Sequence, residues 1–472
     1  MTVLPGGLRV CVESVPQYGR GLAAVALTVA AGSDDDPAGR HGTAHLVEHL
    51  MFPRSGREGS ADPAGEGYAA LVAGAGGVCN AETHRDHTVF HTTVPAELLP
   101  DALAWEAGRL LGFAPTEDVI RTETDVIGEE IRGAGDAGRY WESALGALYP
   151  GSRDSFGTQA ELAGITAGEV EAFFRAHYTA PRMVLSVVGD VDPARVVAVV
   201  REVFAGVVGT AEETCAAEAP RTARETCAAE APRAAEEARV AGEVRTAEAP
   251  RTAREIRTAE QTHTARAPRA AEAPRAATEI RTAPLPTARP GVAVGHPLPD
   301  PVAERPAYLA QAVLAQVLGR SRLPALARSA RDGHRLTSAT VTCGYHGQWL
   351  ASAAPDLTLA VLGRAPGTEV GAAVDIWRSV LRAVADGPLP EAEHRRAVNS
   401  LLVAWHRQAD SLPTRAVALG RDALLLPGSA GPDALPAELR RTTPAEVAAA
   451  ARALLEGPVT VTELAPQKGT VG

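Results

Sequence analysis

One short motif, His45-Leu46-Val47-Glu48-His49, combines residue types and spacing that could do chemistry. On a helix, residues four apart share a face, so His45 and His49 could hold one metal ion between their imidazoles. Glu48 would lie beside that ion, where its carboxylate could take a proton from an activated water. The pattern alone is equally compatible with two solvated histidines and a surface glutamate.

A third metal ligand would favour the catalytic interpretation, because catalytic zinc usually takes three protein ligands and leaves one position open. The segment 116–131 is predicted to be a long amphipathic helix, in which Glu123 and Glu130 share one face. That face presents two carboxylates, and the simpler alternative is a solvated acidic helix.

The elements that must position these residues alternate along residues 1–209. Strands are expected at 8–12, 23–30, 88–94 and 184–188, and helices at 42–52 and 116–131. A similar order returns in residues 291–472, with helices at 305–318, 369–385, 390–410 and 443–455 and strands at 338–342, 356–361 and 459–462. The sequence therefore predicts an α+β fold with two similar halves, each a mainly antiparallel sheet packed with helices.

Residues 210–290 differ in composition from both halves. The octapeptide TCAAEAPR begins at Thr214 and again at Thr226, and almost no Leu, Phe or Ile is available for burial. Such a segment cannot offset the entropy lost on ordering, so it is predicted to be a long low-complexity, disordered linker.

Charge and composition limit the classes of function. The formal net charge of −11 gives no electrostatic footprint for nucleic acid or an anionic membrane. The longest apolar run, 21–32, is about half the ~20 residues that a spanning helix needs, and no secretory signal is visible near the start. Five cysteines, an odd number without a CxxC pair, favour a reducing, cytoplasmic setting.

Several stretches together resemble one family of enzymes. The stretch from Gly42 to Phe52, the stretch from Gly76 to Thr83 and the stretch from Glu123 to Ile131 are similar to the metal helix, the substrate-side strand and the second metal helix of the insulinase/pitrilysin zinc peptidases, family M16. The resemblance is strong over residues 1–209 and weaker over 291–465.

The resemblance implies a role for each residue of the site. His45, His49 and Glu130 would be the zinc ligands, Glu48 the general base and Glu123 a supporting carboxylate. Glu129 is the rival to Glu130, but it lies about 100° round the helix, and Glu130 is favoured because it shares its face with Glu123. The chain would be a zinc-dependent endopeptidase (a hydrolase) acting on peptides or unfolded polypeptides.

The implied substrate-side strand would bind the peptide. The peptide would lie as an added strand along residues 80–83, next to Asn80 and Ala81. His84, His87 and His91 are interpreted as polar residues on or beside the next strand, not as ligands.

One departure from the family pattern bears on partners. Active members carry an Arg and a Tyr in the second half; here Arg328 is the candidate arginine, no tyrosine follows in the next residues, and Tyr345 comes 17 residues later. The resemblance therefore implies a heterodimer with a homologue that supplies the Arg/Tyr pair, with a homodimer as the fallback. Two other functions remain open: removal of leader peptides in natural-product maturation, and a non-catalytic scaffold subunit.

Overall fold

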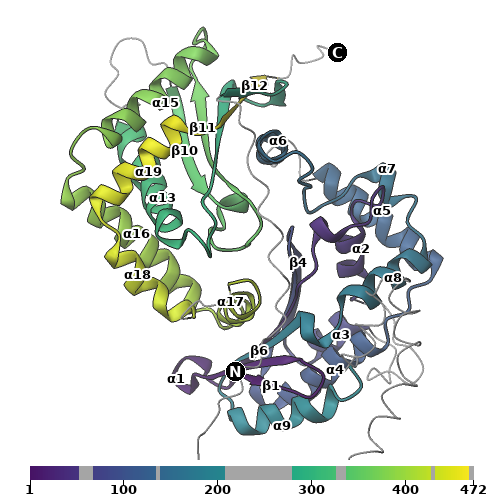
Figure 1. Ribbon diagram of the computed structural model, residues 1–472. Helices are drawn as coiled ribbons and strands as arrows, with labels where there is room; N and C mark the ends of the chain where they lie inside the picture. Colours follow the sequence, from purple (N-terminus) through teal and green to yellow (C-terminus); the bar gives the residue numbers. More distant parts are fainter. Residues whose placement is uncertain (53–66, 134–138, 208–278, 326–335, 427–430, 467–472) are drawn as a thin grey trace, which may run out of the picture.

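A computed structural model describes residues 1–52, 67–133, 139–207, 279–325, 336–426 and 431–466. These residues form two lobes that lie side by side, one from each half of the chain (Figure 1). No helix among the described residues is long and apolar enough to cross a membrane.

The N-terminal half is one six-stranded sheet with helices around it. In spatial order its strands are β1, β2, β6, β3, β5 and β4, and only β2 and β6 pair in parallel. The strands are β1 (Thr2–Val3), β2 (Arg9–Ser14), β3 (Leu22–Val29), β4 (Val78–Thr83), β5 (Thr88–Pro95) and β6 (Met183–Gly189). The helices are α1 (Pro16–Gly19), α2 (Thr43–Leu50), α3 (Tyr68–Gly74), α4 (Leu99–Leu111), α5 (Glu117–Gly133), α6 (Arg139–Leu148), α7 (Gln159–Leu162), α8 (Ala167–His177) and α9 (Pro193–Val203).

The C-terminal half has a second six-stranded sheet. Its order is β10, β11, β9, β12 and β7, with β8 also paired to β12. The strands are β7 (Glu279–Arg281), β8 (Leu285–Thr287), β9 (Gly291–Pro297), β10 (Leu336–Cys343), β11 (Leu357–Arg364) and β12 (Val459–Pro466). The helices are α13 (Arg305–Val317), α15 (Val370–Ala385), α16 (Glu391–Ala409), α17 (Leu412–Leu425), α18 (Leu435–Arg441) and α19 (Pro444–Glu456).

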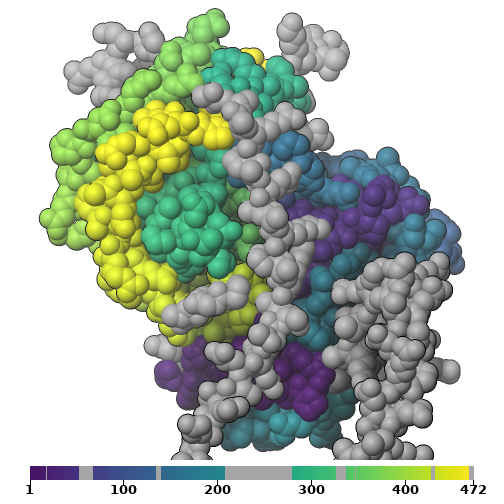
Figure 2. Space-filling view, viewed as in Figure 1, coloured from purple at the N-terminus to yellow at the C-terminus, as the bar shows by residue number. Residues whose placement is uncertain are grey.

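The two sheets repeat one pattern of strand pairing. In the first half a parallel β2–β6 pair is followed by antiparallel β3, β5 and β4, and in the second a parallel β7–β12 pair is followed by antiparallel β9, β11 and β10. The expected α+β fold with two similar, mainly antiparallel halves is confirmed. In Figure 2 the yellow residues of α19 curve around the teal residues of α13 on the face of the second lobe.

The boundary of the second half differs from the sequence-based expectation. The predicted linker ends at 290, but β7 and β8 lie within 279–290 and pair with β12, so the second sheet includes residues from 279 onward. β7 is equivalent in pairing to β2. It is only three residues long and flanked by polar sequence, so periodicity could not identify it. The remainder of the predicted linker, 210–278, lies outside the described residues.

Helix α17 belongs to the second half in sequence but packs on the sheet of the first. It lies against β3, β6 and β5. Gly420 permits this close approach, since a Cβ there would stand 2.5 Å from Thr28 Oγ1 on β3. Arg415 of α17 also pairs with Glu13 of β2 at 2.6 Å. The two halves are therefore joined across the back of the first sheet, opposite the face that α2 covers.

Candidate metal centre

Helix α2 carries the HxxEH motif on the inner face of the first half. Leu46 and Val47 are fully buried, and this fixes which face of the helix points to the core. The helix begins at an N-terminus that Asp36 stabilises, because its two carboxylate oxygens accept from the backbone N–H groups of Gly42 and Ala44 at 2.7 and 2.8 Å. The apolar packing and this cap hold the helix in place.

Three predicted ligands converge at one point. Glu130 Oε2 on α5 lies 3.6 Å from His45 Nε2 and 3.5 Å from His49 Nε2. One ligand atom from each residue falls within 4.8 Å of the others. Two imidazole nitrogens and one carboxylate oxygen form the type of donor set that zinc takes in catalytic sites.

Both histidines are held by their second ring nitrogen. His45 Nδ1 lies 3.0 Å from the backbone oxygen of Phe156, and His49 Nδ1 lies 3.2 Å from Glu123 Oε2. An acceptor at Nδ1 favours the tautomer that carries its proton there, which leaves each Nε2 lone pair directed at the shared point. The donor set therefore fits a divalent metal ion, and Glu123 holds the ring of His49 in this arrangement.

The charge environment of His49 follows from its neighbours. Burial by itself lowers the pKa of His49, but the hydrogen bond to Glu123 and the charges of Glu48, Glu130 and Glu123 outweigh it, so the pKa is raised. A site with this surplus of negative charge attracts a proton or a metal cation.

The two glutamates at 129 and 130 point in different directions. Glu129 pairs with Arg132 at 2.6 Å on the exposed side of α5, while Glu130 faces the histidines. The geometry agrees with the choice of Glu130 over Glu129 made from the shared helix face.

Glu48 is held next to the site by strand β4. Its Oε2 accepts a hydrogen bond from Thr83 Oγ1 at the end of β4. Ala81 is half-buried on the same face of β4 as Thr83, and Asn80 is exposed on the other face. β4 is the last strand of its sheet and pairs only with β5 among the described residues, so its outer edge offers backbone groups for pairing. Arg328, the third predicted substrate-binding residue, lies outside the described residues.

A second layer of charged residues behind the site was not predicted. His41, buried, lies 3.1 Å from Asp36 Oδ2 and 3.2 Å from Asp154 Oδ1. Asp154 Oδ1 also accepts from the backbone N–H groups of Phe156 and Gly157, which shapes the loop whose carbonyl holds His45. Spacing along the sequence gave no signal for this link, because it joins residues more than a hundred positions apart.

The chain matches two family models. Residues 12–134 match the model described as insulinase (peptidase family M16), and residues 164–401 match the model described as the peptidase M16 inactive domain. The chain belongs to peptidase family M16. The resemblance seen in the sequence is thereby confirmed.

Relatives of this M16 chain include named proteases. It is 34% identical over 208 residues to an uncharacterized zinc protease of Mycobacterium leprae, a match that covers 43% of this chain and 45% of that protein. It is 28% identical over 218 residues to the mitochondrial-processing peptidase subunit beta of Dictyostelium discoideum, covering 44% of each. The chain thus spans less than half the length of the curated relatives it matches.

Solved structures share the fold of this M16 chain over nearly its whole length. A protease from Helicobacter pylori superposes with a TM-score of 0.73 at 17% identity, covering 98% of both chains. A likeness at this identity concerns the fold alone.

Of the three histidines after β4 in this M16 chain, His91 lies on β5 and the other two lie beside that strand, as expected. His84 and His87 are buried in the β4–β5 turn, where their rings stack with centroids 4.4 Å apart. Asp86, between them, pairs with His87 and accepts from the backbone N–H of Ala353 in the other half. Burial, despite Asp86, lowers the pKa of His87 to about 4. The turn is a contact between the halves, which a strand pattern cannot reveal.

Tyr345 reaches the first half from the second. Its hydroxyl lies 2.7 Å from Ser155 Oγ, one residue before the Phe156 carbonyl that holds His45. Tyr345 was not expected to form the Arg/Tyr pair, because it follows Arg328 by 17 residues. In the structure it lies behind the metal centre and does not enter it.

Proposed function

We propose that this chain is the zinc-binding subunit of an M16 endopeptidase that hydrolyses peptides or unfolded polypeptides. The observation that carries the proposal is the convergence of His45 Nε2, His49 Nε2 and Glu130 Oε2 beside Glu48 and the open edge of β4. Zinc held by these three residues would supply Lewis-acid polarisation of the scissile carbonyl.

Glu48 moves the proton in this mechanism. Its carboxylate takes a proton from the attacking water and returns it to the leaving amine. The hydrogen bond from Thr83 fixes one oxygen of Glu48, so the other is free to face the reacting atoms. The Phe156 carbonyl and Glu123 lie at the Nδ1 atoms of His45 and His49, so the Nε2 lone pair of each ring is directed at the shared point.

The β4 edge binds the substrate backbone. A peptide that adds as a strand next to Val78–Thr83 gains main-chain hydrogen bonds whatever its sequence. Its scissile bond would come opposite the end of β4, where Thr83 contacts the general base. Asn80 and Ala81 flank the path on its two faces.

A partner subunit completes the proposed enzyme. No tyrosine follows Arg328 at the position typical of the family, and a missing donor to the developing oxyanion would cost about 10²–10³ in rate. We therefore propose a heterodimer with an M16 homologue that carries an Arg/Tyr pair, or a homodimer if Arg328 suffices. A cytoplasmic location is part of the proposal and rests on the odd cysteine count.

The test compares wild type with Glu48→Gln, and with Glu129→Gln as a control on the exposed face of α5. Zinc content is measured by mass spectrometry and turnover with quenched casein peptides, with and without the co-encoded homologue. We expect Glu48→Gln to keep about one zinc per chain and lose turnover by roughly 10²–10⁴, and the control to match wild type. Equal turnover of Glu48→Gln and wild type would reject the mechanism.

The same assay separates the alternative functions. A scaffold subunit, which the match to an M16 inactive domain favours, would show no turnover with any partner. A leader peptidase would cleave a leader-bearing precursor and spare casein peptides.

A further inference from the structure

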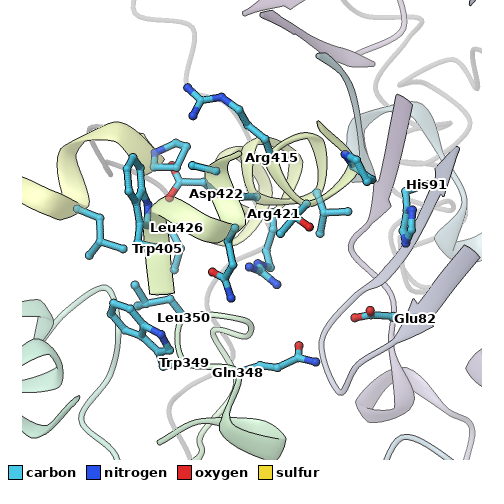
Figure 3. A pocket seen from close by; sticks show the side chains of 18 of the residues that line it. Glu82, His91, Gln348, Trp349, Leu350, Trp405, Arg415, Arg421, Asp422 and Leu426 are labelled. Carbon is cyan, nitrogen blue, oxygen red and sulfur yellow. The ribbon is translucent and has the colours of Figure 1, made fainter. Parts of the chain in front are cut away.

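A cavity lies on the other side of β4 from the metal centre. It has a volume of about 310 Å³ and is bounded by the first sheet on one side and by α16, α17 and the loop at 348–350 on the other. Figure 3 shows Arg421 directed from α17 into this cavity, Glu82 of β4 opposite it, and the rings of Trp349 and Trp405 at the far end. Nothing in the metal chemistry uses this space.

Arg421 is the unbalanced charge in the cavity. Within the described part of the chain its guanidinium makes no hydrogen bond and no ion pair, although five N–H donors are available. Burial lowers the pKa of Arg421 and outweighs the charges of Glu82, Asp86 and Asp422, which oppose that shift. Arg421 is partly buried, so its guanidinium is only partly hydrated, and an anion seated beside it would form charge-assisted hydrogen bonds.

Three other charged groups that line the cavity, Arg415, Arg305 and Glu82, are already paired, and Asp422, the residue after Arg421, lines it too. Arg415 bonds Glu13, and Arg305 bonds Glu438 at 2.9 Å. Glu82, opposite Arg421 in Figure 3, pairs with the ring of His84 at 3.2 Å. The cavity therefore favours a ligand with one negative charge.

The tryptophan rings and the glutamine amide that line the cavity indicate the chemistry of the rest of the ligand. Trp349 and Trp405 are half-buried against the second core and present apolar faces, and Gln348 adds an amide at the lower side of the cavity in Figure 3. A carboxylate on a short hydrocarbon stem matches this lining, because the stem packs on aromatic faces while the charge meets the guanidinium.

The cavity lies next to the proposed peptide path. Thr83 and Glu82 are neighbours on β4, and alternation sends Thr83 toward Glu48 and Glu82 toward the cavity. A peptide added to the edge of β4 alternates in the same way. If its residue opposite Thr83 faces the metal, then an adjacent residue faces Arg421.

We propose that this cavity is a specificity subsite that binds an acidic side chain, aspartate or glutamate, of the peptide substrate, with the carboxylate on Arg421. The proposal rests on the proposed peptidase function. It predicts that the enzyme prefers peptides with an acidic residue one or two positions from the scissile bond.

Equilibrium binding tests the subsite without turnover. The full chain with Glu48→Gln, loaded with zinc and mixed with the co-encoded homologue, is titrated with fluorescein-labelled nonapeptides that differ only by Glu or Gln at one position. We expect one position at which Glu binds about ten- to a hundredfold more tightly, since a hydrogen bond to a charged group has that value. Adding Arg421→Gln should remove this difference and leave the affinity for the Gln peptide unchanged.

Two further variants keep the result interpretable. Arg407→Gln, exposed on α16 near Trp405, is the matched control and should keep the full Glu preference. Arg421→Lys retains the positive charge and should keep part of the preference for the Glu peptide. Removing an unpaired, partly buried cation should not lower the melting temperature, so loss of fold in Arg421→Gln would contradict the assignment of Arg421 as unpaired.

The outcomes separate a failure of the subsite from a failure of the peptidase function. Equal affinity for Glu and Gln at every position overturns the subsite and leaves the peptidase function standing. No binding of any peptide overturns both. Free glutarate that quenches tryptophan fluorescence through Arg421 without competing with bound peptide would identify a small-carboxylate site and overturn the substrate assignment.

Discussion

Replacing His41 with glutamine would test the charged layer behind the metal centre. The ring of His41 lies between Asp36 and Asp154, with distances of 3.1 and 3.2 Å from its two nitrogens. Burial by itself lowers the pKa of His41, but the hydrogen bonds to Asp154 and Asp36 and their charges outweigh it and raise the pKa from 6.5 to about 9. The folded protein therefore holds a proton here that the unfolded chain releases at neutral pH.

The size and the sign of the effect follow from these two values. The difference between 6.5 and about 9 corresponds to about 3 kcal/mol, at 1.36 kcal/mol for each pKa unit. Because the folded pKa is the higher one, this stability is fully present below pH 6.5. It declines as the pH rises and is lost once the pH passes about 9.

The assay is urea unfolding of the metal-free full chain between pH 6 and 10. We expect the free energy of unfolding of wild type to exceed that of His41→Gln by about 3 kcal/mol at pH 6. The difference should fall through pH 7–9 toward the smaller contribution that a neutral His41 makes through its hydrogen bonds. His406→Gln, exposed at the end of α16, is the control and should show no such trend.

The metal affinity of His41→Gln tests whether this charged layer supports the metal centre. Loss of the His41–Asp154 contact should loosen the Phe156 carbonyl that holds His45, and outer contacts of this type typically change metal affinity by about 10–100-fold. A wild-type minus variant difference that stays constant from pH 6 to pH 10 would refute the charged-layer argument, whatever its size.

Three shorter predictions follow from other parts of the molecule. Glu130→Gln should weaken zinc binding by at least about tenfold while Glu129→Gln leaves it unchanged, as measured by competition with a chromogenic chelator, and the reverse order would reassign the ligand. Gly420→Val should destabilise the packing of α17 on Thr28 by about 1–3 kcal/mol and speed proteolysis between the halves, whereas Gly371→Val, with open space around it, should not accelerate that cleavage. Deleting residues 214–225, one repeat of the predicted linker, should leave the melting temperature and turnover within error, and a large loss of stability would contradict the composition argument.

The local sequence pattern was sufficient to predict the helices that carry the site. His45 and His49 are four apart on an amphipathic segment, and Glu123 and Glu130 share a face of another, so geometry within each helix placed the donor atoms correctly relative to one another. The preference for Glu130 over Glu129 came from the same periodicity. Apolar and β-branched runs also anticipated β3, β5 and β6, which are largely buried.

Contacts between segments far apart in the chain were decided only by tertiary packing. The sequence alone determined the family, the two similar halves and the three metal-binding candidates, because those depend on residue type and short-range spacing. It did not indicate that α17 crosses to the first sheet, that His41 joins Asp36 to Asp154, or that Arg421 enters a cavity beside Glu82. Each of these depends on where two chain segments meet, and the burial and charge that follow arise only when the halves are packed together.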